Sequence, residues 1–449
     1  MIIIKNGRVI DPANNIDKTA DIVINDGIIT FVGDSSQYAF VGTRRAVSVL
    51  HGDCDIYAGT ARRAPTDKNN SLIQIIDASG LIVAPGLVDM HVHLRDPGQT
   101  HKEDIISGCR AAAAGGVTSL LCMPNTSPAI DCADTVKYVA EKAKNADARV
   151  YIAGAVTTGL AGLNPADFAG LKSAGAIAIT DDGVPVWDDK ILRAVLSDSK
   201  GLAVLCHGEV RNKSQGGIMR GKKIPAELGV VGIPADVEWH DVLRTIRFAE
   251  ELGAAVHICH VSTKTSLDRI REAKKRGVRV TCETAPHYCA FTLNKLKSRD
   301  ADYRMNPPLG SSFDLGAVRK ALNDGTIDCI ATDHAPHSPD EKSDFMAAPN
   351  GVIGMETSLS AMLTYTNLNI SDIINLMSYS PAKILGIPAG TLSIGAPADI
   401  CIFDPNKEWT IDVNNLHGKS KNAVFKGCRL TGKVVRTILG GRTVYQIDN

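Results

Sequence analysis

The sequence predicts an α/β protein: a (β/α)8 barrel with a small β-sandwich domain formed by both termini. Three observations predict it. Eight short apolar runs, typical of parallel strands buried on both faces, recur between residues 85 and 387. A segment long enough for a crossover follows each run, and several of these segments show helical periodicity. Both ends of the chain instead carry β-type patterns bounded by turn residues.

The expected barrel strands are short and rich in Val, Ile, Leu and Ala. They cover residues 86–93, 117–123, 148–155, 176–180, 201–206, 254–259, 278–283 and 327–332. Helical patterns between them include residues 102–116, 134–145, 241–253 and 266–277, and several end in Gly, a common helix stop. Eight such units within about 300 residues favour a closed TIM barrel, and an open doubly wound sheet is the alternative.

The pattern divides the chain into three segments. Residues 1–84 and 388–449 are expected to build the small β domain, and residues 85–387 the barrel. The pairs Asn6-Gly7 and Asp26-Gly27 predict hairpin turns. Residues 35–72 mix Gly, Arg, Ser, Asp and Asn with weak periodicity, which predicts a long solvated insertion in the small domain; a binding patch formed by its four arginines is the alternative.

Composition excludes several classes of protein. Lys plus Arg and Asp plus Glu both number 49, so no net charge attracts nucleic acid or an anionic membrane. No apolar run reaches 18 residues, and no membrane span is expected. The 11 cysteines are scattered without a CxxC pair, which favours a reducing, cytoplasmic location.

Chemically active side chains follow the expected strands, where a barrel places its functional groups. His91 and His93 are two residues apart and share one face of the first strand. The other strand ends carry Asp181 and Asp182, His207, His260 and Asp333, after the fourth, fifth, sixth and eighth strands. His257 lies three residues before His260, on the opposite face, and is expected to be a packed or surface histidine.

Four histidines and two aspartates at one rim predict a metal site. Nitrogen and oxygen ligands without thiolate suit zinc, manganese or iron, and histidine-rich sites most often hold zinc. Six ligands exceed the three protein ligands of one catalytic zinc, so two metals that share a bridging carboxylate are expected.

The motifs at these strand ends resemble those of the amidohydrolase superfamily. They are residues 89–128, ITDDG, HICHVSTK, YRMNPPLG and IATDHAPH. Within that superfamily the chain is most similar to type I dihydroorotases, over residues 1–34 and 73–449. No lysine stands at the fourth strand end, so the resemblance implies a bridging carboxylate and not a carbamylated lysine.

The resemblance implies a role for each residue. His91, His93 and Asp333 match ligands of one zinc, His207 and His260 match ligands of a second, and Asp182 matches the bridge. Asp333 also matches the catalytic acid/base, which takes a proton from the metal-bound hydroxide and passes it to the leaving amide nitrogen. The substrate contacts implied are His93, Arg95, Asn125, Asn306, His337, Asn350 and Gly351.

Two roles are possible for Arg95. Its planar fork can bind a substrate carboxylate, or it can form a surface ion pair with Asp96. The resemblance favours the carboxylate. The charged loop between Asp333 and Gly354 is a candidate to close over substrate.

The implied activity is the reversible conversion of (S)-dihydroorotate and N-carbamoyl-L-aspartate in pyrimidine (UMP) biosynthesis. Two alternatives remain. One is another cyclic amide hydrolase, an allantoinase or a hydantoinase/dihydropyrimidinase. The other is an inactive scaffold for aspartate carbamoyltransferase, which the complete ligand set argues against. The resemblance further implies a homo-oligomer, and aspartate carbamoyltransferase is a candidate partner.

Overall fold

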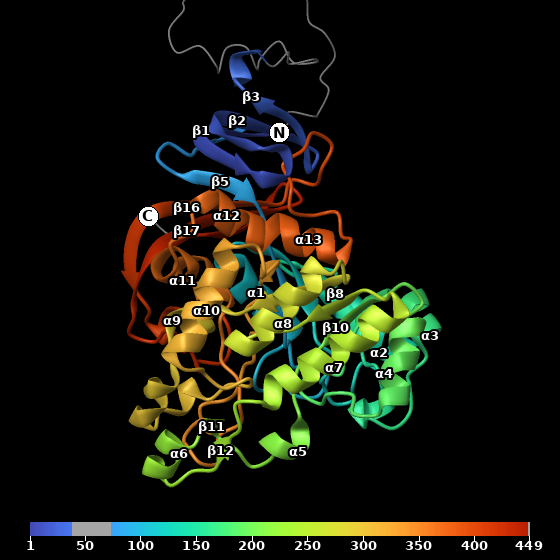
Figure 1. Ribbon diagram of the computed structural model, residues 1–449. Coiled ribbons are helices and arrows are strands. Elements are labelled where there is room, and N and C mark those ends of the chain that lie inside the picture. The colour runs from blue at the N-terminus through green and yellow to red at the C-terminus, as the bar shows by residue number, and fades with distance from the viewer. Residues whose placement is uncertain (38–72, 448–449) are drawn as a thin grey trace, which may run out of the picture.

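The computed structural model describes residues 1–37 and 73–447, so the predicted insertion lies outside the described residues from residue 38 onward. Two eight-stranded sheets organise the described part, one forming the barrel and one lying against it (Figure 1). Among these residues, no helix combines the length and the apolar character that a membrane crossing requires.

The barrel strands are all parallel and follow one another in chain order around the sheet. They are β6 (Leu87–Val92), β7 (Val117–Cys122), β8 (Arg149–Gly154), β9 (Ala176–Ile179), β10 (Ala203–Cys206), β13 (Val256–Ile258), β14 (Val280–Thr284) and β15 (Cys329–Ile330). Val92 pairs with His334, and the His93 amide donates to the His334 carbonyl at 2.8 Å, which joins the last strand to the first. The predicted closed barrel is therefore confirmed, and the open-sheet alternative is wrong.

Helices surround the strands as the periodicity predicts (Figure 1). The outer layer comprises α1 (Ile105–Ala114), α2 (Ala133–Ala143), α3 (Phe168–Ala174), α4 (Asp189–Ser197), α7 (Val237–Leu252), α8 (Lys264–Lys275), α10 (Ser312–Asn323) and α11 (Ser358–Tyr365). Helix α1 begins at a capping box, in which the Asp104 carboxylate accepts from the Ser107 amide. Helix α8 begins similarly at Thr263, whose hydroxyl accepts from the Ser266 amide.

Shorter elements extend the connections after three of the strands. After β10 lie α5 (Arg211–Ser214), β11 (Met219–Arg220), α6 (Lys223–Leu228) and β12 (Gly232–Ile233). Helix α9 (Pro286–Ala290) follows β14, and α12 (Ile370–Ile374) and α13 (Ser380–Leu385) follow α11.

The second sheet draws its strands from both ends of the chain. They are β1 (Ile2–Asp11), β2 (Ile16–Asn25), β3 (Ile28–Gly33), β4 (Gln74–Asp77), β5 (Ile82–Pro85), β16 (Ile400–Thr410), β17 (Arg429–Leu439) and β18 (Arg442–Gln446). Strand β5 joins the two halves, because it pairs with β1 on one side and β16 on the other. Buried aliphatic residues of both halves, among them Ile22 and Ile402, form its core.

The hairpin prediction at Asn6-Gly7 is wrong, whereas Asp26-Gly27 does connect β2 to β3. Strand β1 runs through Asn6 and Gly7 with a bulge between Ile4 and Gly7. A Cβ on Gly7 would lie 2.5 Å from a methyl of Val83, so the glycine permits close approach of β5. Here the Asn-Gly pair marks a packed bulge in the strand.

A layer of apolar side chains fills the barrel interior. It includes Met90, Leu121, Ala153, Ala178 and Leu205. Because this layer is packed, the polar groups gather where the strands end, at the carboxyl-terminal mouth. The mouth is therefore where the predicted ligands meet.

Candidate metal centre

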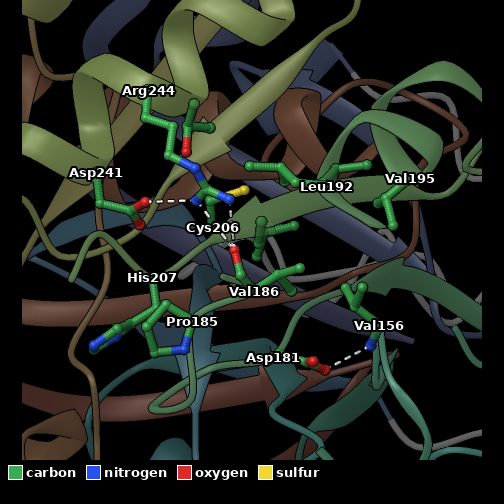
Figure 2. Close-up of a pocket in the computed structure, with 13 residues that line it drawn as sticks. Val156, Asp181, Pro185, Val186, Leu192, Val195, Cys206, His207, Asp241 and Arg244 are labelled. Carbon is green, nitrogen blue, oxygen red and sulfur yellow. Dashed lines mark hydrogen bonds and ion pairs between the residues drawn. The ribbon is translucent and has the colours of Figure 1, made fainter. Parts of the chain in front are cut away.

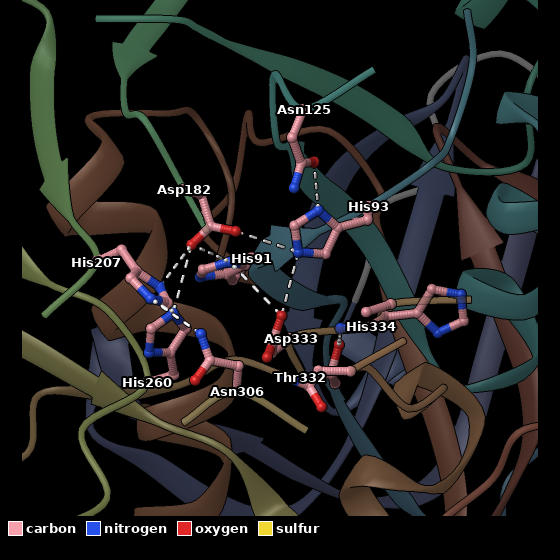
Figure 3. A network of polar contacts seen from close by, with 12 residues as sticks. His91, His93, Asn125, Asp182, His207, His260, Asn306, Thr332, Asp333 and His334 are labelled. Carbon is pink, nitrogen blue, oxygen red and sulfur yellow. Dashed lines mark hydrogen bonds and ion pairs between the residues drawn. The ribbon is translucent and has the colours of Figure 1, made fainter. Parts of the chain in front are cut away.

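Six predicted ligand side chains meet at the mouth of the barrel (Figure 3). They are His91, His93, Asp182, His207, His260 and Asp333, and each is between 0% and 7% exposed. Four imidazoles and two carboxylates removed from water in one place need a partner to offset their desolvation.

Asp182 lies at the centre of this cluster. Its Oδ1 is 3.3 Å from His91 Nε2 and 3.4 Å from both His207 Nδ1 and His260 Nε2. Its Oδ2 is 3.5 Å from His93 Nε2. Asp333 Oδ1 faces the same side, 3.2 Å from His93 Nε2 and 3.7 Å from His91 Nε2. Asp182 thus stands between one pair of histidines and the other.

These separations fit ligands around a common ion. Two ligand atoms about 2.1 Å from a tetrahedral metal lie roughly 3.4 Å apart. His91 Nε2 is buried and has no hydrogen-bond partner, although it points into the cluster. The groups His91–His93–Asp333 and His91–Asp182–His260 each bring one ligand atom per residue within 4.8 Å of one another. The residues therefore fit a metal centre with two adjacent positions.

Two deeper groups with cysteine are less suited to a metal. His91–Cys259–Glu283 and His257–Glu283–Cys329 satisfy the same distance condition. Burial raises the pKa of the Cys259 thiol to about 12, and burial also raises the pKa of the Cys329 thiol well above its ordinary value. The thiolate is the form of cysteine that binds a metal, and these thiols are protonated. The cluster of histidines and aspartates at the barrel mouth is therefore the better metal site.

The carboxylates of the site are held ionised. Burial opposes the charge on Asp182, but His91, His207 and His260 outweigh it and lower its pKa well below the usual value. The pKa of Asp333 is lowered for the same reason, with burial outweighed by the hydrogen bond from His93 and by the neighbouring imidazoles. Metal ligands must be deprotonated, so the two ionised carboxylates suit cation binding.

Polar partners orient the histidine rings. Asn125 Oδ1 lies 2.7 Å from His93 Nδ1, and Glu283 Oε1 lies 2.7 Å from His91 Nδ1. Because both partners accept, each ring carries its proton on Nδ1 and presents Nε2 to the cluster. Glu209 holds His207 in turn, with Oε2 2.9 Å from Nε2.

Sequence reasoning did not identify Glu283 or Glu209 as partners. A signal for Glu283 exists in hindsight, because it is an acidic residue near the end of a buried strand, directly after Cys282. Its 0% exposure requires a hydrogen-bonded or charged partner. Glu209 lies two residues after His207.

Three site residues adopt a backbone conformation that is uncommon for side chains other than Gly. The φ angles are 61° at Arg95, 34° at His260 and 50° at Asp333. Non-glycine residues in this region cluster at functional sites, where surrounding contacts hold the backbone in place. Each of the three immediately follows or closely follows a barrel strand.

Arg95 is buried beside the cluster and forms no surface ion pair with Asp96. Its Nε donates to the Pro336 carbonyl at 3.1 Å, and its Nη2 is 3.4 Å from His337 Nε2. Asp96 instead accepts from the Tyr138 hydroxyl. Burial lowers the pKa of Arg95 to about 10 against the pull of the two site aspartates, so it stays cationic at neutral pH.

The remaining predicted substrate contacts fall into two places. His337 Nε2 donates to the Asn350 carbonyl at 2.9 Å, and a Cβ on Gly351 would lie 3.0 Å from that nitrogen. The bond to His93 uses Oδ1 of Asn125, so it does not engage the two amide N–H donors of that side chain. Asn306 Nδ2 donates to Glu209 Oε2 at 3.1 Å, so it lies at the His207 side of the site.

Asn422, far along the chain, ties these loops together and was not predicted. Its Oδ1 accepts from the His337 amide, and its Nδ2 donates to the carbonyls of Ala335 and Gly351. A single asparagine in a polar stretch gives no sequence signal for this role.

The loop after the eighth strand is pinned in place. The buried Lys342 ammonium donates to the carbonyls of Ala301, Arg304 and Pro349 at 2.9, 3.3 and 2.9 Å. Burial lowers the pKa of Lys342 to about 8. These bonds anchor the segment that the sequence suggested as a closing loop.

A small cavity lies beside His207 on the outer side of the site (Figure 2). Its volume of about 20 Å³ holds roughly one water and no substrate. Arg244 bridges Asp241 and the Val186 carbonyl across it. Asp181 accepts from the Val156 and Thr157 amides, which leaves Asp182 as the aspartate that enters the metal site.

Comparisons with known proteins agree with this architecture. The model of the amidohydrolase family matches residues 82–444. The chain belongs to the amidohydrolase family. This confirms the predicted superfamily, and the relatives named next place the chain among its dihydroorotases.

Two relatives are similar over their whole length. A protein of Citrifermentans bemidjiense named dihydroorotase is 45% identical over 99% of both chains. A dihydroorotase of Geobacter sp. strain M21 is 44% identical, also over 99% of both. The L-hydantoinase (dihydropyrimidinase) of Arthrobacter aurescens superposes with a TM-score of 0.83, covering 100% of this chain and 96% of its own. At 24% identity, that likeness shows the shared fold.

Proposed function

We propose that this amidohydrolase is a dihydroorotase that interconverts (S)-dihydroorotate and N-carbamoyl-L-aspartate in pyrimidine biosynthesis. It is a hydrolase acting on a cyclic amide, as its full-length relatives named dihydroorotase indicate. The observation that carries the choice of substrate is the buried Arg95 guanidinium beside the ligand cluster. Dihydroorotate carries a ring carboxylate that a planar cation can bind, whereas hydantoin and dihydropyrimidine rings lack it.

We assign the six ligands to two zinc positions. His91, His93 and Asp333 would hold one ion, His207 and His260 the other, and Asp182 would bridge them. Zinc bound there would polarise the amide carbonyl and lower the pKa of a bound water. The ligand chemistry supports zinc, because nitrogen and carboxylate donors without thiolate suit it.

The chain's own residues would supply binding and proton transfer. Arg95, Asn125 and His337 would hold the substrate carboxylate, and Asn306 and the backbone of Asn350 and Gly351 would contact the ring. In ring opening, Asp333 would take the proton of the attacking water and deliver it to the amide nitrogen as the C–N bond breaks. In ring closure the same carboxyl group would begin protonated.

The decisive experiment measures loss of dihydroorotate absorbance by zinc-loaded protein, with hydantoin, dihydrouracil and allantoin as alternative substrates. We expect turnover of dihydroorotate and little of the others. Turnover of hydantoin or allantoin without dihydroorotate would overturn the proposal and favour another cyclic amide hydrolase. Absence of all turnover and of bound metal would favour an inactive scaffold for aspartate carbamoyltransferase.

We further propose a homo-oligomer located in the cytoplasm. Sedimentation of the purified protein alone, and after mixing with aspartate carbamoyltransferase, tests its self-association and its association with that enzyme. A monomer boundary for the protein alone would contradict self-association. Two unshifted boundaries in the mixture would contradict association with aspartate carbamoyltransferase.

A further inference from the structure

A line of hydrogen-bonded side chains descends from the metal site into the barrel. Glu283 on β14 is fully buried, and its two carboxylate oxygens point to different histidines. Oε1 is 2.7 Å from His91 Nδ1, and Oε2 is 3.3 Å from His257 Nε2. The other nitrogen of His257, Nδ1, is 2.8 Å from the Thr281 hydroxyl.

The donors and acceptors along this line are mutually consistent. An ionised carboxylate only accepts, so His91 donates from Nδ1 and His257 donates from Nε2. His257 Nδ1 then carries a lone pair, and the Thr281 hydroxyl donates to it. Every polar atom of His257 is thereby satisfied within a 3% exposed side chain.

The line ends at the opposite end of the barrel from the ligand cluster. His257 lines a cavity of about 660 Å³ together with Lys200, Arg279 and Lys383, residues near the amino-terminal ends of the strands or on α13. His257 has no contact with Asp182 or Asp333 among the described interactions. Among the described side-chain contacts, Glu283 is what links His257 to the ligand cluster.

We propose that His257 is a positioning residue that fixes Glu283, and that Glu283 in turn fixes the ring and tautomer of His91 for metal binding. This inference rests on the proposed metal centre. Partners that orient a metal-binding histidine typically change metal affinity by about 10- to 100-fold when they are lost. Without the His257 N–H, one oxygen of Glu283 is buried unpaired, and the carboxylate can turn away from His91.

Two substitutions at His257 separate positioning from packing. His257→Leu fills the space and removes the donor. His257→Gln also removes the imidazole ring, but its side-chain amide keeps an N–H donor near the position of Nε2. We expect zinc affinity, measured by competition with a chromophoric chelator, to fall about 10-fold in the leucine variant and to recover largely in the glutamine variant. Equal zinc affinity in wild type and His257→Leu, or equal loss in both variants, would overturn the proposal.

A double-mutant cycle tests the route. Glu283→Gln alone should weaken zinc binding, and His257→Leu added to it should cause no further loss, because His257 acts through Glu283. Additive losses would refute this order. Thermal melting of metal-stripped variants shows whether each one folds.

Chelator competition is independent of turnover. A protein that binds zinc with the expected variant pattern but does not convert dihydroorotate would refute the proposed function and leave this inference standing.

Discussion

Replacing Arg95 by lysine removes the planar fork while keeping the positive charge. Arg95 is 7% exposed, and its Nε is committed to the Pro336 carbonyl at 3.1 Å, which fixes the plane of the guanidinium. The terminal nitrogens would then be available together for a substrate carboxylate. An ammonium in the same place offers one charged point and loses the paired geometry.

The magnitude follows from one lost hydrogen bond. A hydrogen bond to a charged group contributes about 1.5–3 kcal/mol, which corresponds to a KM increase of roughly 10- to 150-fold. The assay is steady-state kinetics with dihydroorotate and with N-carbamoyl-L-aspartate, alongside metal quantitation. Arg193→Lys is a matched control, because Arg193 is a half-exposed arginine paired with Glu251. An unchanged KM in the Arg95 variant, with metal content intact, would refute the assigned role.

Three further predictions concern the acid/base, the metal and a helix cap. Asp333→Asn should lower kcat by about 10²- to 10⁴-fold while the melting temperature of the metal-stripped protein stays near wild type; wild-type kcat would contradict the acid/base role. Stripping the metal should lower the melting temperature, and zinc at 100 times its Kd should restore about 2.7 kcal/mol; identical melting curves with and without zinc would argue against the centre. Hydrogen bonds and Lys419 outweigh burial and lower the pKa of Asp104 to about 2. Because this pKa lies below the ordinary 3.8, the charged Asp104 carboxylate stabilises the fold above about pH 4. This stabilisation is lost as the pH falls toward 2. Urea unfolding of Asp104→Asn should therefore show a loss of about 1 kcal/mol at pH 7, given its partial exposure, that shrinks below pH 4; a pH-independent difference would contradict it.

The barrel and its six candidate ligands were predictable because both depend on local patterns and one topological rule. Buried parallel strands give continuous apolar runs, and the ends of such strands meet at one mouth. His91 and His93 share a face by alternation, and Asp333 is placed by its position after the last strand. None of these inferences needs the distance between two particular side chains.

The same local reasoning failed at Asn6-Gly7. An Asn-Gly pair favours a hairpin, but here strand β1 continues through the pair as a bulge, and Gly7 lies close against Val83. Whether a glycine serves a turn or a close approach depends on what lies across from it, and sequence spacing does not contain that information.

By itself, then, the sequence determined the barrel, the domain built from both ends and the set of candidate ligands, since periodicity and strand ends encode them. Only the tertiary structure decided which groups orient those ligands. Glu283 reaches His91 from 192 residues away, and Asn422 joins Ala335 and Gly351 across the chain. Such bonds depend on strand register and loop packing to within a few tenths of an ångström, which no local pattern specifies.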